Sequence, residues 1–282
     1  MIRHPTWHPI WHVTARRRWP GLLAITVLAL SLLLARPARA DVEVDLALVI
    51  AVDISYSMDP DEQALQREGF AEAFRSPLVK DAIRKGMVGR IGVTYLEWAG
   101  AFDQRVAIPW TLLDSVESID AFADRIAATP LRRAQRTSIS GAIDAAAKLQ
   151  AESGFLATRR VIDISGDGPN NQGRFVTIAR DEAVRAGITI NGLPIMLKTP
   201  GYFDIPDLER YFRDCVIGGQ GAFMVPARNK PELQEAIRTK ILLEVAGGPP
   251  PPSLIIPAQA TAPQPRANCL VGETQWRDRM GN

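Results

Sequence analysis

One uninterrupted apolar run constrains the fold of this chain more than any other feature of its sequence. The run extends from Leu46 to Val52 and is followed by Asp53, Ser55 and Ser57. Seven consecutive apolar residues that lead into polar ones predict a strand buried on both faces, as in a parallel sheet. Because alternate residues of an extended segment point the same way, the carboxylate and the two hydroxyls can converge beyond the strand. Such oxygen-only ligands suit a hard cation such as Mg²⁺.

Patterns of strand and helix alternate along the chain up to residue 246. We expect strands at residues 46–52, 90–99, 105–110, 159–165, 187–196 and 222–226, and helices at residues 60–75, 118–128, 139–152, 174–186 and 230–245. A short polar turn at residues 102–104 joins two of the strands, so one edge strand should be antiparallel. The alternation predicts one α/β domain over residues 41–246, with a doubly wound, mostly parallel sheet and helices on both faces.

Two later loops place oxygen-bearing side chains at the ends of expected elements. Asp167 stands directly after an expected strand, between two glycines, whereas Asp163 lies within that strand and is expected to be a buried structural carboxylate. Thr137 lies just before an expected helix, where its hydroxyl is either an N-cap or a metal ligand, and the first motif favours the ligand. By contrast, Asp59 and Glu62 predict a capping box for the helix at 60–75, not metal ligands.

The first 40 residues predict a secretory signal peptide. Arg16–Arg18 form a basic segment, an apolar run follows from Leu22 to Ala35, and Ala38-Arg39-Ala40 matches an Ala-x-Ala cleavage site. Cleavage after Ala40 would yield a periplasmic or secreted protein. An uncleaved membrane anchor is the alternative, but the apolar run is shorter than the roughly 20 residues of a spanning helix. We therefore expect no membrane span after cleavage.

Removal of this leader changes the charge and the chemistry of the chain. The whole sequence has 33 basic and 31 acidic residues, and the leader holds six of the arginines and no acid. The remaining chain has 27 basic and 31 acidic residues, which is not the clustered positive excess of a nucleic-acid-binding protein. All three histidines also lie in the leader. Their absence from the mature chain excludes Ser-His-Asp and Cys-His catalysis and the usual zinc sites.

The C-terminal region differs in composition from the rest. Residues 247–282 are rich in proline and lack periodicity, which predicts an extended, largely disordered tail. The two cysteines of the chain are Cys215, in the expected domain, and Cys269, in the tail. In an oxidising compartment they either form a disulfide or remain as free thiols, because the spacing alone does not decide the geometry.

Five oxygen-bearing residues stand in three separate loops: Asp53, Ser55, Ser57, Thr137 and Asp167. Their order and context resemble the metal-ion-dependent adhesion site (MIDAS) of the von Willebrand factor type A (vWA) domain. The resemblance extends over about residues 45–245 and is greatest to the exported bacterial vWA-like proteins called DUF1194. The chain departs from the vWA pattern at Gly166, where threonine is common, but it retains the aspartate that follows.

The resemblance implies a metal-binding interaction domain without enzymatic activity. The five residues would bind Mg²⁺, which Mn²⁺ could replace, and an acidic residue of a protein partner would complete the coordination. Two neighbouring carboxylates repel each other by about 3 kcal/mol at an effective dielectric constant of about 20, and a bound cation removes this penalty. In the loop that presents Thr137, Arg132, Arg133 and Arg136 either steer an anionic partner toward the ion or form a solvated basic loop.

Two alternative functions belong to different classes. An apolar strand that ends in aspartate also opens the haloacid-dehalogenase-type phosphatases, in which Asp53 would be the nucleophile. Those enzymes usually have a second carboxylate two residues later, where this chain has Ser55. The other alternative is an envelope assembly factor that binds its partner without a metal. The intact set of ligand residues favours metal-dependent binding over both.

Overall fold

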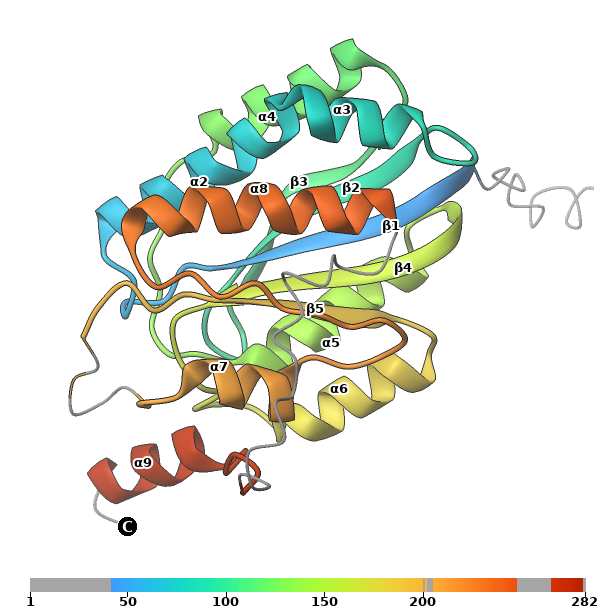
Figure 1. Cartoon of the computed structure of the whole chain (residues 1–282). Coiled ribbons are helices and arrows are strands. Elements are labelled where there is room, and N and C mark those ends of the chain that lie inside the picture. The colour runs from blue at the N-terminus through green and yellow to red at the C-terminus, as the bar shows by residue number, and fades with distance from the viewer. Residues whose placement is uncertain (1–41, 200, 202–204, 248–264, 281–282) are drawn as a thin grey trace, which may run out of the picture. The chain divides into compact units, whose positions relative to one another are not determined.

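The computed structural model describes residues 42–199, 201, 205–247 and 265–280. In this part of the chain, five strands form one sheet in the order β3-β2-β1-β4-β5 (Figure 1). The strands are β1 (Val42–Asp53), β2 (Ile91–Trp98), β3 (Gln104–Leu113), β4 (Phe155–Gly166) and β5 (Thr189–Pro194). Four of them are parallel, and β3 pairs antiparallel with β2 at one edge. The predicted doubly wound α/β fold with one antiparallel edge strand is confirmed.

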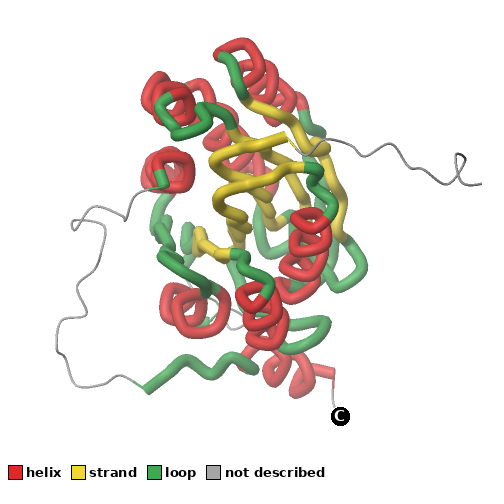
Figure 2. Tube along the Cα trace, turned by 90° about the vertical axis from the view of Figure 1, so that its right-hand side faces the viewer, coloured by secondary structure: helices red, strands yellow, loops and turns green. Residues whose placement is uncertain are grey.

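Helices cover both faces of the sheet (Figure 1, Figure 2). On one face lie α2 (Pro60–Arg75), α3 (Pro77–Arg84), α4 (Val116–Ala128) and α8 (Lys230–Ala246). On the other face lie α5 (Ile139–Ala151), α6 (Val176–Arg185), α7 (Leu208–Tyr211) and a π-helical turn at Phe212–Val216. β1 sends Leu48 and Ile50 into the first apolar layer and Val49 and Ala51 into the second. Burial on both sides explains why its sequence is continuously apolar.

The start of α2 follows the predicted capping box. Asp59 Oδ1 accepts a hydrogen bond from the Glu62 N–H at 2.8 Å, and Glu62 Oε2 accepts one from the Asp59 N–H at 2.9 Å. These bonds satisfy backbone donors that the first turn of a helix leaves unpaired. Asp59 is thus the N-cap of α2, and its carboxylate is engaged at the helix end.

Two elements differ from the sequence prediction. Helix α3 was not expected. The strand predicted at residues 222–226 is wrong, because this segment forms only isolated bridges to β5, such as Gly192 with Met224. It runs beside the outer edge of β5 and donates single hydrogen bonds, including the Val225 N–H to the Gly192 carbonyl at 3.0 Å. The Ala227 N–H likewise donates to the Pro194 carbonyl at 3.0 Å. Pro194 itself has no N–H to return to this segment, so a continuous ladder cannot form there.

The described part of the C-terminal region is not extended. Residues 265–280 include helix α9 (Val271–Met280), and Cys269 forms a disulfide with Cys215, with a Cα–Cα distance of 5.5 Å. This bond decides the alternative that the sequence left open. Residues 248–264 and the predicted signal peptide lie outside the described residues. Among the helices that are described, none has the length and apolar character needed to cross a bilayer.

Candidate metal centre

Three loops meet at the carboxyl ends of the central strands: loop 1 (residues 54–58), loop 2 (residues 130–138) and loop 3 (residues 167–175). Loop 1 continues directly from β1, whose last residue, Asp53, is completely buried. The Ser55 N–H donates to Asp53 Oδ1 at 2.7 Å, which turns the chain immediately after the strand. The Ser55 and Ser57 hydroxyls then lie 2.7 Å apart. The convergence predicted for these alternate residues is therefore present in the geometry.

Loop 3 brings the second carboxylate to the same point from the neighbouring strand, β4. The Ser57 hydroxyl donates to Asp167 Oδ1 at 2.6 Å. Gly166 stands beside the buried Asp53, and a Cβ at this position would lie 3.1 Å from Asp53 Oδ2. A larger residue would have to displace the carboxylate by a small amount. The glycine that departs from the common vWA pattern thus leaves room next to Asp53.

Loop 2 is held to both of the other loops by backbone hydrogen bonds. The Tyr56 N–H donates to the Ala134 carbonyl, and the Ala134 N–H donates to the Ile54 carbonyl, both at 3.0 Å. On the other side, the Thr137 N–H donates to Asn171 Oδ1 at 3.0 Å, and the Asn171 N–H donates to the Thr137 carbonyl at 2.8 Å. Loop 2 therefore bridges loops 1 and 3, and Thr137 is positioned by its contact with loop 3.

Thr137 is not the N-cap of the helix that follows it. The cap of α5 is Ser138, whose hydroxyl accepts the Gly141 N–H at 3.1 Å. Thr137 is 5% exposed and lies one residue before the cap. The sequence left open whether Thr137 is the N-cap of this helix. Because Ser138 is the N-cap, the Thr137 hydroxyl is not needed for capping. Its role as a metal ligand stays a prediction.

The electrostatics of Asp53 are those of a carboxylate without a counterion. Its Oδ2 atom is buried and has no hydrogen-bond partner in the described part of the chain. Burial, and next the charge of Asp167, raise the pKa of Asp53 to about 8. A cation at this position would satisfy the unpaired oxygen and offset the repulsion between the two carboxylates.

The donor set fits a hard divalent cation. Two carboxylates and three hydroxyls offer oxygen alone, which suits Mg²⁺ or Mn²⁺ better than a soft metal. No cluster of three or more His, Cys, Asp or Glu side chains that could hold a metal exists among the described residues. A site here would therefore depend on serine and threonine hydroxyls as well as on Asp53 and Asp167.

Arg132 and Arg133 are both engaged in contacts with neighbouring residues. Arg132 forms ion pairs with Glu97 at 3.4 Å and with Asp103 at 3.5 Å. Arg133 donates to the Tyr56 carbonyl at 2.8 Å, and its guanidinium carbon lies 5.0 Å from the centre of the Tyr56 ring. Glu97 is 4% exposed, which agrees with a structural role for it. Arg133 thus holds loop 2 against loop 1, and Arg132 holds it against β2 and the turn that follows β2. A role of the arginines in attracting a partner stays a prediction.

Arg136 has a different environment from the other two arginines. Its guanidinium carbon lies 3.3 Å from the centre of the Trp276 ring, which belongs to α9. Its φ angle is +75°, and no other non-glycine residue among those described has a positive φ. Such a left-handed conformation is unfavourable for arginine and indicates that the surrounding structure imposes it.

Two residues that shape the site, Lys198 and Asn171, were not predicted from the sequence. Lys198 lies in the long segment after β5, forms an ion pair with Glu62 at 2.7 Å and donates to the Ser57 carbonyl. No local pattern distinguishes it from any other surface lysine. Asn171 joins loops 2 and 3 as described above, and its only sequence signal is its place shortly after Asp167.

Asp163, the other carboxylate of the β4 region, lies outside the candidate metal site. It is buried within β4 and forms an ion pair with Lys240 of α8 at 2.9 Å. Burial raises the pKa of Asp163, while the charge of Lys240 opposes this shift. The expected structural role for Asp163 matches this geometry.

Comparisons with known proteins agree with this architecture. A structure of proximal thread matrix protein 1 (PTMP1) from the mussel byssus has a TM-score of 0.53 at 14% identity, and the match covers 73% of this chain and 49% of that one. Another structure of the same protein, with a zinc-occupied MIDAS motif, has a TM-score of 0.50 at 10% identity, covering 73% and 47%. The von Willebrand factor type A protein from Catenulispora acidiphila has a TM-score of 0.50 at 16% identity, covering 72% and 43%.

A bacterial adhesin has the same fold. The pilus adhesin SpaC from Lactobacillus rhamnosus GG, in its open conformation, has a TM-score of 0.51 at 10% identity, and the match covers 72% of this chain and 30% of that one. This chain thus spans less than half of each of these proteins. No curated protein sequence matches it at a significant level. The family described as "Protein of unknown function (DUF1194)" matches residues 43–249. Because this match covers most of the chain, the protein belongs to the DUF1194 family and has a vWA-like fold.

Proposed function

We propose that this protein binds a protein partner through a divalent cation held by loops 1, 2 and 3. One observation carries the proposal: the hydroxyls of Ser55 and Ser57 and the carboxylate of Asp167 form a continuous chain of short contacts, at 2.7 and 2.6 Å, beside the buried Asp53. The two serines follow β1, whereas Asp167 follows the neighbouring strand β4. Their convergence supports a common ligand, and their chemistry suits Mg²⁺, with Mn²⁺ as a substitute.

Each part of the site would have a defined role. The hydroxyls of Ser55, Ser57 and Thr137 would bind the ion as neutral ligands, and Asp53 and Asp167 would supply the negative charge. Mg²⁺ prefers six oxygen ligands, so five residues would leave one position, where an acidic residue of the partner would complete the coordination. The zinc-occupied MIDAS of PTMP1 and the occurrence of this fold in a pilus adhesin support this role.

The geometry gives less support to a phosphatase. A nucleophile must be accessible to its substrate, whereas Asp53 is fully buried and its Oδ1 accepts the Ser55 N–H. Ser55 also occupies the position two residues later where a second carboxylate would be needed. We therefore propose a binding role without catalysis. The convergence of all three loops likewise favours metal-dependent binding over assembly through other surfaces.

We further propose that the protein is exported. The leader at residues 1–40, with cleavage after Ala40, would direct the chain to the periplasm or the exterior. The disulfide between Cys215 and Cys269 supports this location, because such bonds persist mainly in oxidising compartments.

The metal site is tested by titrating the mature chain, residues 41–282, with Mg²⁺ and with Mn²⁺ in a calorimeter. At about 100 times its dissociation constant, the ion should raise the unfolding free energy by about 2.7 kcal/mol. Asp167→Ala should abolish binding. Asp61→Ala, which removes an exposed acid from the first turn of α2, is the matched control and should bind like wild type.

Three outcomes would separate the functions. An unfolding temperature of the wild type that does not change between Mg²⁺ and chelator would refute the metal site and favour the assembly factor. Turnover of phosphate esters that Asp53→Asn abolishes would favour the phosphatase. Recovery of a partner from envelope extract with Mg²⁺ but not with chelator, and not with Asp167→Ala, would support the proposed function.

A further inference from the structure

Helix α9 packs directly against the loop that bears Asp167. A Cβ at Gly272 would overlap the carbonyl oxygen of Asn170 and would lie 3.1 Å from Pro169 Cγ. The backbone of α9 therefore lies against loop 3 with no side chain between them, an approach that only glycine permits. Asn170 is itself fully buried and stands three residues after Asp167. The helix thus contacts the part of loop 3 that continues from the proposed ligand.

Glu273 fixes the orientation of Asn170. Asn170 Nδ2 donates to Glu273 Oε1 at 2.8 Å, while Asn170 Oδ1 accepts the Ser140 N–H at 2.9 Å. The Asn170 N–H donates to the Tyr211 hydroxyl at 3.1 Å. Asn170 is therefore held by α5, α7 and α9 at once. Asn170 Nδ2 also donates to the Arg174 carbonyl at 3.2 Å. Loss of the Glu273 carboxylate would therefore leave one buried N–H of the amide unpaired, which is costly and weakens the hold on loop 3.

Trp276 makes the corresponding contact with loop 2. The guanidinium of Arg136 stacks on its ring at 3.3 Å, and Arg136 directly precedes Thr137. The left-handed φ of +75° at Arg136 is an unfavourable backbone conformation for a residue with a side chain. The cation–π contact with Trp276 is favourable and can offset the cost of this conformation. α9 therefore supports the backbone on either side of the proposed site, at Arg136 and at Asn170.

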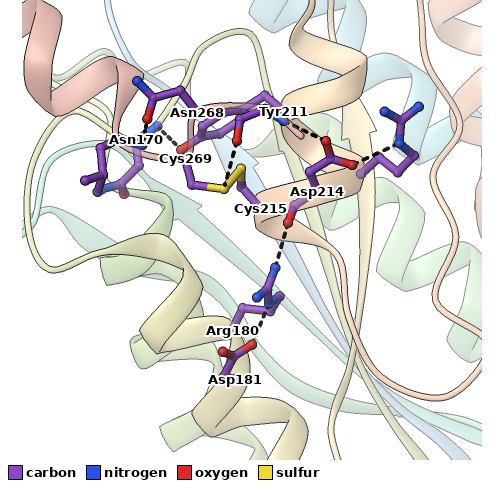
Figure 3. The surroundings of a disulfide bond; sticks show 11 residues. Asn170, Arg180, Asp181, Tyr211, Asp214, Cys215, Asn268 and Cys269 are labelled. Carbon is purple, nitrogen blue, oxygen red and sulfur yellow. Dashed lines mark hydrogen bonds and ion pairs between the residues drawn. A yellow bond between two sulfur atoms is a disulfide. The ribbon is translucent and has the colours of Figure 1, made fainter. Parts of the chain in front are cut away.

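A covalent tether keeps α9 in this place. Figure 3 shows the disulfide that joins Cys269, just before α9, to Cys215, which is fully buried. Next to Cys215 in the chain, Asp214 accepts the Ala267 N–H at 2.8 Å through its Oδ2 atom. Val271, the first residue of α9, packs against the apolar layer that contains Cys215. The family match ends at residue 249, so this tethered helix is an addition to the matched domain.

We propose that α9 is a clamp that holds loops 2 and 3 in the geometry required for metal binding, with Glu273 and Trp276 as its positioning residues. The proposal rests on the metal site proposed above. In this proposal α9 acts on the metal site through loops 2 and 3 and does not contact the ion itself. The disulfide makes the clamp permanent as long as the compartment is oxidising.

The first test measures Mn²⁺ and Mg²⁺ affinity by calorimetry with the disulfide intact. Glu273→Ala and Trp276→Ala should each raise the dissociation constant roughly tenfold, the lower end of the effect of residues that orient metal ligands. Glu273→Gln keeps an acceptor for Asn170 and should restore most of the affinity. Arg277→Ala changes an exposed residue on the same helix and should bind like wild type.

The second test needs no metal. Amide hydrogen exchange in chelator should increase in residues 131–138 and 167–172 of Trp276→Ala and Glu273→Ala, and it should not change in β1. An increase throughout the domain, with a lower unfolding temperature in chelator, would indicate a merely structural role and overturn the clamp.

These measurements separate failure of the clamp from failure of the metal site. If the wild type binds metal and the α9 variants bind it equally well, the clamp is wrong and the proposed function stands. If the wild type binds neither ion, the metal site is wrong, and with it the link between α9 and metal binding. Unchanged exchange in loops 2 and 3 would overturn the clamp in either case.

Discussion

Lys240 is the residue whose substitution the structure predicts to be most damaging to stability. Its Nζ lies 2.9 Å from Asp163 Oδ1 and 2.8 Å from Glu244 Oε1. All three side chains are at most 1% exposed. Asn191 donates to both Glu244 oxygens at 2.9 Å. One cation thus neutralises two carboxylates that have no access to water, between β4 and α8.

Lys240→Met keeps the length of the side chain and removes its charge. Breaking a buried ion pair by removing one partner costs about 3–5 kcal/mol, and here two buried carboxylates would lose their counterion. We therefore expect a loss of at least about 4 kcal/mol at neutral pH. Burial already raises the pKa of Asp163, and loss of Lys240 would raise it further. A carboxyl whose pKa is raised in the folded state lowers the unfolding free energy of the protein as pH rises. The stability lost in Lys240→Met should therefore be smaller at about pH 5 than at neutral pH.

Chemical denaturation followed by circular dichroism would measure this loss at both pH values. Lys85→Met is the matched control, because it breaks an ion pair with Asp81 at 2.6 Å whose side chains are 74% and 55% exposed. Exposed pairs contribute about 0–1 kcal/mol, so the control should lose less than about 1 kcal/mol. Equal losses in the two variants would refute the conclusion that this buried network stabilises the fold. If Lys240→Met fails to fold, the additional substitutions Asp163→Asn and Glu244→Gln should restore folding.

Three further predictions concern the site and its surroundings. In chelator, the unfolding free energy should fall as pH rises from about 4 to about 8, because burial and the charge of Asp167 raise the folded-state pKa of Asp53. Asp53→Asn should flatten this pH dependence, which a series of denaturation curves at different pH values would measure. Replacing both Cys215 and Cys269 by serine opens a link across 54 residues and should cost about 4 kcal/mol, measured against the oxidised wild type. Asp59→Ala should cost about 1 kcal/mol of stability yet leave the Mg²⁺ dissociation constant unchanged, whereas a weakened affinity would show that Asp59 is more than a cap.

Local patterns were sufficient to predict most of the sheet and the first half of the site. The run from Leu46 to Val52 is too apolar for a strand with one solvent-exposed face. Because side chains alternate in direction along an extended segment, Asp53, Ser55 and Ser57 come to one side. The capping box of α2 is likewise contained in four consecutive residues. Strand burial, side-chain alternation and helix capping depend on residues close together in the sequence, so they can be predicted from it.

The missed elements lacked a sufficient local signal. Helix α3 has eight residues and is separated from the end of α2 by Ser76 alone. Its short periodic pattern follows that of the longer helix too closely to be recognised as a separate element. Residues 222–226 have the composition of a strand, but β5 ends at Pro194, which has no N–H to donate to them. The tail after Gly247 is proline-rich, and the stability of α9 comes from contacts with the domain more than from its own sequence.

The sequence by itself determined the order of most elements, the residue types available to a metal and the absence of histidine after residue 12. Only the tertiary structure decided that Ser138 caps α5 in place of Thr137, that Arg132 pairs with Glu97, and that α9 returns to loops 2 and 3. The physical reason is distance along the chain: Ser57 and Asp167 are 110 residues apart, yet their side chains lie 2.6 Å from each other. A contact of that kind exists only after β1 and β4 pair and the helical layers pack around them.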